Sequence, residues 1–192
     1  MGVYTTEIAS DRITSDNPIH QRLLQAYHLA TDYITGELLE IGCGEGRGID
    51  VALPHCSGYT GIDKIREVIE KLSDKYPDQK FIAGNIPPLQ MFEDNSFDSI
   101  ISFQVIEHIE DDRLFLKEIS RILRPGGIAL LTTPNISMSL SRNPWHIREY
   151  TPEELSKLAS PYFEQVRMKG ITGNEKVMKY YEMNKASVER IT

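Results

Sequence analysis

Short apolar segments alternate with amphipathic helical segments along most of this 192-residue chain. This alternation predicts parallel strands, because a helix between two strands returns the chain to the edge where the first strand began. The strands are nearly continuous in apolar residues, which indicates burial on both faces of a sheet. The expected fold is α/β, a doubly wound and mostly parallel sheet with helices on both faces. Its strands are expected at residues 38–41, 59–63, 80–83, 97–103, 128–132 and 163–168.

The length fits one domain, within which three parts can be distinguished. Residues 1–35 form an N-terminal arm and a helix that begins near Asp16 and Pro18 and ends at Gly36. Residues 36–168 form the core, and a Ser-, Asn- and Pro-rich stretch at 134–150 is expected to be a lid loop. Residues 169–192 form a polar tail, for which we predict a helix.

Composition and charge exclude several classes of protein. Lys and Arg total 21 and Asp and Glu total 28, so the net charge is −7 and long-range attraction to a nucleic acid is weak. No stretch approaches the roughly 20 apolar residues of a membrane helix, and the first residues do not read as a signal peptide. The two cysteines, Cys43 and Cys56, form neither a CxxC pair nor a zinc pattern. We therefore expect a cytoplasmic protein with no nucleic-acid or membrane partner.

The most informative segment is a glycine-rich turn that follows the strand at 38–41. It carries Gly42, Gly44, Gly46 and Gly48, and the strand before it contains Glu40. Glycine permits positive φ and lets a ligand come close to the backbone. In a doubly wound sheet this turn lies at the carboxyl edge, where ligands bind.

A dinucleotide-binding turn would read GxGxxG. Counting from Gly42 places Arg47 at the last glycine position, and counting from Gly44 places Ile49 there. Neither register fits a nicotinamide dinucleotide. The chain has instead an acidic residue followed by GxGxG.

Further motifs follow in order along the chain. They are Asp63 at the end of the second strand and the segments Gly84–Ile86, Asp94–Asp98, Gln104–Ile109 and Leu123–Gly127. Together with the glycine turn, they resemble class I S-adenosylmethionine-dependent methyltransferases over about residues 36–135. This resemblance implies a Rossmann-like sheet of six to seven strands. Six expected strands end by about Met168, and the tail contains no good seventh strand. Either the final strand is missing from this chain, or the tail replaces it by packing on the sheet edge or on a second subunit of a homodimer.

The resemblance also implies roles for individual residues toward S-adenosylmethionine. The glycines at 42, 44 and 46 pack against its amino-acid part and ribose, and Glu40 lies near its cationic end. Asp63 accepts hydrogen bonds from the ribose hydroxyls, Asn85 binds the adenine amino group, and Ile86 covers the ring. The full set of expected cofactor residues is Glu40, Gly42, Gly44, Gly46, Asp63, Lys64, Asn85, Ile86 and Gln104.

The segments Thr132–Asn135 and Asn143–Thr151 resemble a branch that includes ubiquinone-pathway O-methyltransferases and enzymes of sugar or polysaccharide biosynthesis. This favours an oxygen atom of a small molecule as the methyl acceptor. His108 and His146 are equal candidates for a general base, although His108 could instead orient a loop. The residues expected at the acceptor are Trp145, Arg148 and Tyr150. Alternatively, Trp145 and Tyr150 pack the lid, and Arg148 forms a salt bridge with Glu149 or another acid.

The expected chemistry is in-line attack of an acceptor atom on the sulfonium methyl group. No group of His, Asp and Glu has metal-ligand spacing along the sequence, so we expect no metal. Two rivals remain, a cofactor-binding protein without catalysis and, less favoured by the glycine spacing, an NAD-dependent oxidoreductase.

Overall fold

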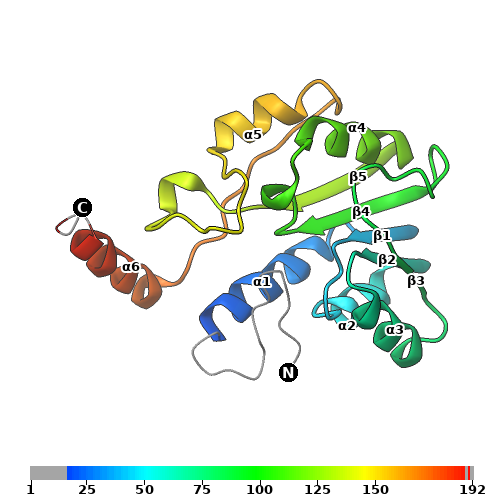
Figure 1. Ribbon diagram of the computed structural model, residues 1–192, viewed down its shortest axis with the longest axis horizontal. Helices are drawn as coiled ribbons and strands as arrows, with labels where there is room; N and C mark the ends of the chain where they lie inside the picture. The colour runs from blue at the N-terminus through cyan, green and yellow to red at the C-terminus, as the bar shows by residue number, and fades with distance from the viewer. Residues whose placement is uncertain (1–16, 189, 191–192) are drawn as a thin grey trace.

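Five parallel strands form a single sheet in the computed structural model, which describes residues 17–188 and 190. The sheet order is β3-β2-β1-β4-β5, and every neighbouring pair is parallel (Figure 1). The order reverses between β1 and β4, which is where ligands bind in open α/β sheets. The strands are β1 (Glu37–Ile41), β2 (Gly58–Asp63), β3 (Lys80–Ala83), β4 (Phe97–Phe103) and β5 (Leu123–Thr132). The predicted α/β class is confirmed.

Helices cover both faces of this sheet and enclose two hydrophobic clusters (Figure 1). On one face lie α1 (Asn17–Ala30), α2 (Ile49–Ala52) and α3 (Arg66–Lys75); on the other lie α4 (Asp112–Ile122) and α5 (Pro152–Ala159). In Figure 1, α6 (Glu175–Val188) extends away from the sheet. Within the described part of the chain, three short 3-10 helices are also present, η2 (Leu53–His55), η3 (Ile106–His108) and η4 (Ile136–Met138).

The starts of α4 and α5 show why the sequence folds locally as it does. The Asp111 carboxylate accepts a hydrogen bond from the Leu114 backbone N–H at 2.8 Å, which caps α4. Thr151 and Glu154 cap α5 reciprocally, and Pro152 occupies the first helical position.

The predicted sixth strand at residues 163–168 is wrong. The backbone there pairs with no strand, and among the described residues the sheet has five strands, not six or seven. Phe163 and Val166 do pack against the cluster beneath α4 and α5, but Met168 is 41% exposed. Apolar side chains that cover a core from an irregular segment produce the same local pattern as a strand, because hydrophobic packing needs no backbone ladder.

The fifth strand also begins earlier than predicted. Leu123 lies opposite Phe97, but the next pair along the ladder is Ser99 with Ile128, so residues 124–127 bulge out of register. Arg124 fixes this bulge, since its Nη1 donates to Asp98 Oδ2 at 2.5 Å. The Pro-Gly-Gly sequence therefore lies inside β5, where it interrupts the pairing with β4, and not in a turn before the strand.

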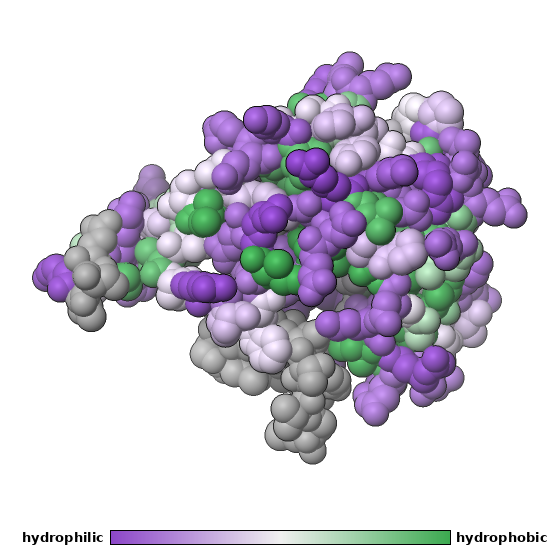
Figure 2. Space-filling model, turned by 45° about the horizontal axis from the view of Figure 1, so that its top comes forward, coloured by the Kyte–Doolittle hydropathy of each residue, from purple (hydrophilic) through white to green (hydrophobic). Residues whose placement is uncertain are grey.

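Hydrophilic side chains cover most of the face shown in Figure 2, and hydrophobic ones lie there in small separate groups. No helix within residues 17–188 combines the length and the apolar character needed to cross a bilayer. Residues 1–16 of the predicted N-terminal arm lie outside the described residues.

Candidate functional site

The glycine turn after β1 has the backbone geometry that its sequence predicts. Gly42 has φ +78°, and a Cβ there would lie 2.4 Å from the Val105 side chain. Gly44 has φ +49°, and a Cβ there would meet no atom within 4 Å. Gly42 is thus required by close packing, whereas Gly44 faces open space into which a ligand can approach the backbone.

Asp63 joins the end of β2 to this turn. Its Oδ2 accepts a hydrogen bond from the Gly44 N–H at 2.9 Å, and its Oδ1 accepts one from the Ile65 N–H at 3.0 Å. Each carboxylate oxygen has two acceptor sites, so both oxygens keep capacity for a hydroxyl of a ligand. Lys64, next in the chain, is exposed.

Glu40 lies deeper, on the strand below the turn, and is 1% exposed. The phenol hydroxyls of Tyr27 and Tyr59 donate to its two oxygens, each at 2.5 Å. Burial raises the pKa of the Glu40 carboxyl to about 7, against the opposing effect of the two phenol hydrogen bonds. This tyrosine pair was not predicted from the sequence, because Tyr27 lies on α1 and Tyr59 on β2.

The other predicted cofactor residues lie along the same edge. Asn85 is exposed just after β3, and Ile86 is partly buried against the core. Gln104 directly follows β4 with φ +58°, and its Nε2 donates to Thr132 Oγ1 at 3.2 Å. The parallel register therefore brings the ends of all five strands to the edge that carries the glycine turn.

The loop at 134–150 is folded back onto η3. An isolated bridge between Asn135 and Tyr150 closes its base. Near its end, the backbone N–H groups of Ile147 and Arg148 both donate to the carbonyl oxygen of Glu107, at 2.8 and 3.3 Å. The loop is thus attached to the segment that directly follows β4.

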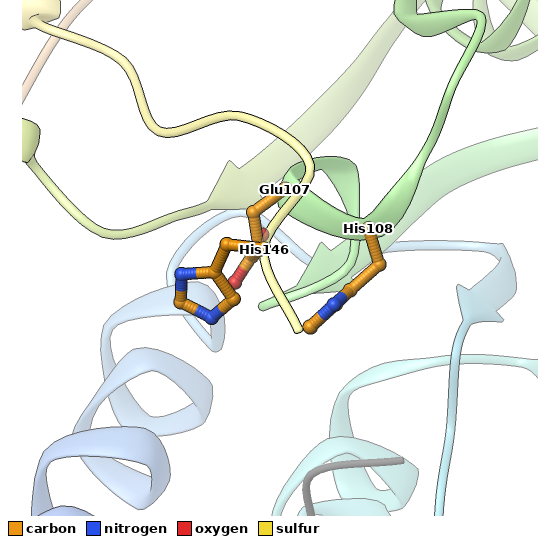
Figure 3. A group of neighbouring side chains, drawn as sticks. All are labelled: Glu107, His108 and His146. Atoms are coloured by element: carbon orange, nitrogen blue, oxygen red, sulfur yellow. The ribbon is translucent and has the colours of Figure 1, made fainter. Parts of the chain in front are cut away.

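This attachment brings together His108 and His146, the two predicted general bases. Their ring centroids lie 5.1 Å apart, with the rings edge to face. Figure 3 shows Glu107 and His108 on the turn after β4 and His146 on the loop that crosses it. One ligand atom from each of these three residues lies within 4.8 Å of the others.

Both imidazoles are oriented through Nδ1. His108 Nδ1 lies 2.8 Å from the carbonyl oxygen of Trp145, which can only accept, so this nitrogen carries the hydrogen. His146 Nδ1 lies 2.6 Å from Glu149 Oε1, and its Nε2 lies 3.0 Å from Asn143 Nδ2. In the neutral rings, the lone pair is therefore on Nε2.

Arg148 and Tyr150 meet a carboxylate of the protein. Arg148 Nη1 and the Tyr150 hydroxyl both donate to Asp112 Oδ2, at 2.6 and 3.0 Å. The salt bridge that was the alternative for Arg148 is thus present, with Asp112 as the acid. Tyr150 is 3% exposed, whereas the side chain of Trp145 is 53% exposed.

Glu107 is the residue that sequence reasoning left without a role. Its two carboxylate oxygens are buried beside the histidines. The expectation that no metal binds rested on spacing along the chain, and the folded loop now supplies a group that this spacing did not show. The signal was present in the sequence as an adjacent Glu-His pair after the fourth strand.

Comparisons with known proteins agree with this geometry. A family profile described as "Methyltransferase domain" matches residues 39–131. A Mycolicibacterium smegmatis protein named "Probable S-adenosylmethionine-dependent methyltransferase" is 39% identical over 127 residues, which cover 64% of this chain and 49% of that protein. A Mycobacterium tuberculosis protein named "Phthiotriol/phenolphthiotriol dimycocerosates methyltransferase" is 32% identical over 119 residues, or 59% and 44% of the two chains. The chain spans about half the length of the curated relatives that it matches.

Solved structures show the same fold. The PH0226 protein of Pyrococcus horikoshii matches with a TM-score of 0.70 and 20% identity, over 88% of this chain and 92% of that one. The glycine turn, Asp63 and the order of the later motifs lie within or beside the matched residues. Residues 39–131 therefore match the methyltransferase-domain family, and relatives that share this part of the chain are named S-adenosylmethionine-dependent methyltransferases.

Proposed function

We propose that this chain binds S-adenosylmethionine at the carboxyl edge of its sheet and transfers the methyl group to an oxygen atom of a small molecule. The observation that carries this proposal is the pairing of Gly44 with Asp63. The turn is open at Gly44, and the carboxylate that holds its N–H has acceptor capacity for a ribose diol. An open backbone beside a fixed carboxylate suits a nucleoside that carries no pyrophosphate.

The cofactor residues then divide along the edge of the sheet. Asp63 accepts from the ribose, with Lys64 beside it, and Asn85 and Ile86 receive the adenine. The turn at Gly42, Gly44 and Gly46 and the end of β4 at Gln104 surround the amino-acid part. When it is ionised, Glu40 contributes negative potential below the turn, which favours a ligand that carries a sulfonium and an ammonium group.

Methyl transfer needs little covalent help from the protein, because the sulfonium already activates the methyl group. Alignment of the acceptor oxygen with the carbon–sulfur bond can lower the barrier by about 7–11 kcal/mol. An alcohol must also lose its proton, and His108 and His146 are our candidates for the group that receives it. The Nδ1 hydrogen bonds of both rings place the lone pair on Nε2, which a proton acceptor requires.

The loop at 134–150 forms the acceptor side. Its exposed apolar side chains are Ile136, Met138, Trp145 and Ile147, and they favour an acceptor with an apolar part. One mycobacterial relative is named as a methyltransferase of phthiotriol and phenolphthiotriol dimycocerosates. We propose that Trp145 contacts the acceptor, and that Arg148 and Tyr150 shape the pocket through Asp112.

Other expectations from the sequence stay predictions. They are the covering role of residues 1–35 and 134–150, a homodimer, the lack of a nucleic-acid partner and a cytoplasmic location.

The proposal is tested by incubating the protein with methyl-labelled S-adenosylmethionine and a panel of phenols, sugars, hydroxy lipids and carboxylates. Transfer of label to a hydroxyl oxygen supports the proposal. Tight binding of S-adenosylhomocysteine with no transfer to any acceptor supports the rival of a non-catalytic binder. Binding of NAD without binding of S-adenosylhomocysteine contradicts both.

A further inference from the structure

We propose that Glu107, His108 and His146 form a binding site for one divalent first-row transition-metal ion. The three side chains offer one carboxylate oxygen and two imidazole nitrogens, all within 4.8 Å of one another. Ligand atoms bound about 2.1 Å from a shared ion lie no more than about 4.2 Å apart. Side-chain shifts of less than about 1 Å therefore suffice to close the site.

The donor set fits this class of ion. Two imidazoles and one carboxylate are the protein ligands of many catalytic metal sites, and they leave coordination positions open for water or substrate. Such a set differs from the all-oxygen cages that Ca²⁺ and Mg²⁺ prefer. The ion is therefore of the Zn²⁺, Co²⁺ or Mn²⁺ kind.

The surroundings of the two histidines support the site independently of the distances. Histidines that bind a metal usually donate their other ring N–H to a carboxylate or a backbone carbonyl. His146 has Glu149 Oε1 at 2.6 Å from Nδ1, and His108 has the Trp145 carbonyl oxygen at 2.8 Å from Nδ1. Both rings thus have the outer hydrogen bond that fixes Nε2 as the metal ligand.

Contacts of the loop backbone hold His146 beside Glu107 and His108. His146 lies between Trp145, whose carbonyl holds His108, and Ile147, whose N–H is bound to the Glu107 carbonyl oxygen at 2.8 Å. The loop cannot move away from η3 without breaking these bonds. Binding through His146 Nε2 replaces one contact, the hydrogen bond from Asn143 Nδ2 at 3.0 Å.

Burial of the Glu107 carboxylate also supports a cation at this site. Carboxylates inside proteins are paired with a positive charge or bind a metal ion, because removing their charge from water is costly. The two neighbouring histidines can meet this need in two ways, as a protonated partner of Glu107 or as fellow ligands of a cation. The experiment below separates these two states.

The role of the ion in the reaction rests on the proposed function. Glu107 and His108 follow β4 directly, near Gln104, so a bound ion lies on the acceptor side of the cofactor edge. When the ion is bound, the Nε2 atoms of His108 and His146 are its ligands and receive no proton. An acceptor hydroxyl on the ion instead loses its proton more readily, and that proton passes to solvent water. The oxygen then forms a bond to the methyl carbon, and the carbon–sulfur bond breaks with its electron pair left on sulfur as S-adenosylhomocysteine. This favours an acceptor with a hydroxyl able to bind a metal, such as one of a vicinal diol.

Metal-stripped protein is titrated with Co²⁺, followed by visible ligand-field absorption, and with Zn²⁺ and Mn²⁺ by calorimetry. We expect one ion per chain. Glu107→Gln, His108→Ala and His146→Ala each weaken binding by at least about 10-fold. Glu149→Gln replaces the carboxylate that holds His146 Nδ1 and weakens binding by about 10–100-fold. His55→Ala, at an exposed histidine outside the site, leaves it unchanged.

Binding of S-adenosylhomocysteine to each variant reports on the cofactor edge and on folding. Saturable Co²⁺ binding lost in the three ligand variants, with cofactor binding retained, supports the metal site. Absence of saturable binding, or binding that the three variants do not weaken, overturns it and leaves the Glu107–histidine pair. Metal binding without any cofactor binding would instead contradict the proposed function while the metal site stands.

Discussion

His108 and His146 lie edge to face, with ring centroids 5.1 Å apart and planes at 76°. Their proximity depends on the loop at 134–150, which reaches back to η3 through the carbonyl oxygens of Trp145 and Glu107. The strand ends therefore build the cofactor edge, and one folded loop builds the acceptor side. These two halves can be tested separately.

The open turn at Gly44 predicts a loss of cofactor affinity on substitution. Gly44→Ala adds a methyl group in open space at φ +49°, where a ligand would approach. A side chain in this left-handed region costs about 1–2 kcal/mol of stability. Calorimetry with S-adenosylhomocysteine should therefore show weaker binding, beyond the small loss of stability.

Gly126→Ala is the matched control. Gly126 also has positive φ, at +80°, and a Cβ there also meets nothing within 4 Å, but it lies in the bulge of β5 away from the turn. Both variants should lose similar stability in urea unfolding, and only Gly44→Ala should lose cofactor affinity. Equal affinity in the two variants would mean that the ligand does not approach Gly44.

We expect the Asp112 carboxylate to hold the end of the loop at 134–150 against the core. Asp112→Ala removes the acceptor for both Arg148 and Tyr150, so the end of the loop loses two hydrogen bonds. The loop should open more often, and trypsin should cleave faster after the exposed Arg142. Cofactor affinity should change little, because Asp112 lies outside the glycine turn.

Asp94→Ala serves for comparison in the same digest. It removes an exposed partner of Arg121, a residue of α4. If trypsin cleaves both variants at the wild-type rate after Arg142, then Asp112 does not hold the loop.

Glu40 predicts a dependence of stability on pH. Its pKa is raised from 4.5 to about 7 in the folded protein, chiefly by burial. The folded state thus holds this proton more tightly than the unfolded state, so the stabilisation is complete below pH 4.5 and is lost as pH rises through 7. The full change is on the order of 3 kcal/mol.

Glu40→Gln removes this titration and keeps a side chain that can meet Tyr27 and Tyr59. Urea unfolding between pH 4.5 and 8 should show a smaller fall in the free energy of unfolding for the variant than for the wild-type protein. Parallel curves for the two proteins would show that Glu40 does not titrate in this range.

The sequence predicted those parts of the molecule that depend on local rules. The glycine turn, Asp63 and the caps at Asp111 and Thr151 could be recognised because spacing along the chain determines each of them. The strand ends followed from the parallel crossovers. Strand count was less predictable, since Phe163 and Val166 pack on the core without pairing.

Contacts between distant segments could not be read from the sequence. The pairing of Arg148 with Asp112, the two phenols on Glu40 and the group of Glu107 with both histidines all join elements far apart in the chain. Each depends on where a loop or helix packs against the sheet. No periodicity in a single segment specifies such contacts.

Titration of the protein with S-adenosylhomocysteine, alongside NAD, tests the central claim most directly. We predict saturable binding of one S-adenosylhomocysteine per chain and none of NAD. Asp63→Asn should weaken that binding by about 10-fold or more, because a hydrogen bond to a charged group contributes about 1.5–3 kcal/mol. Asp78→Asn, at an exposed aspartate outside the site, should leave it unchanged. Absence of S-adenosylhomocysteine binding, or binding of equal strength in Asp63→Asn, would contradict the account.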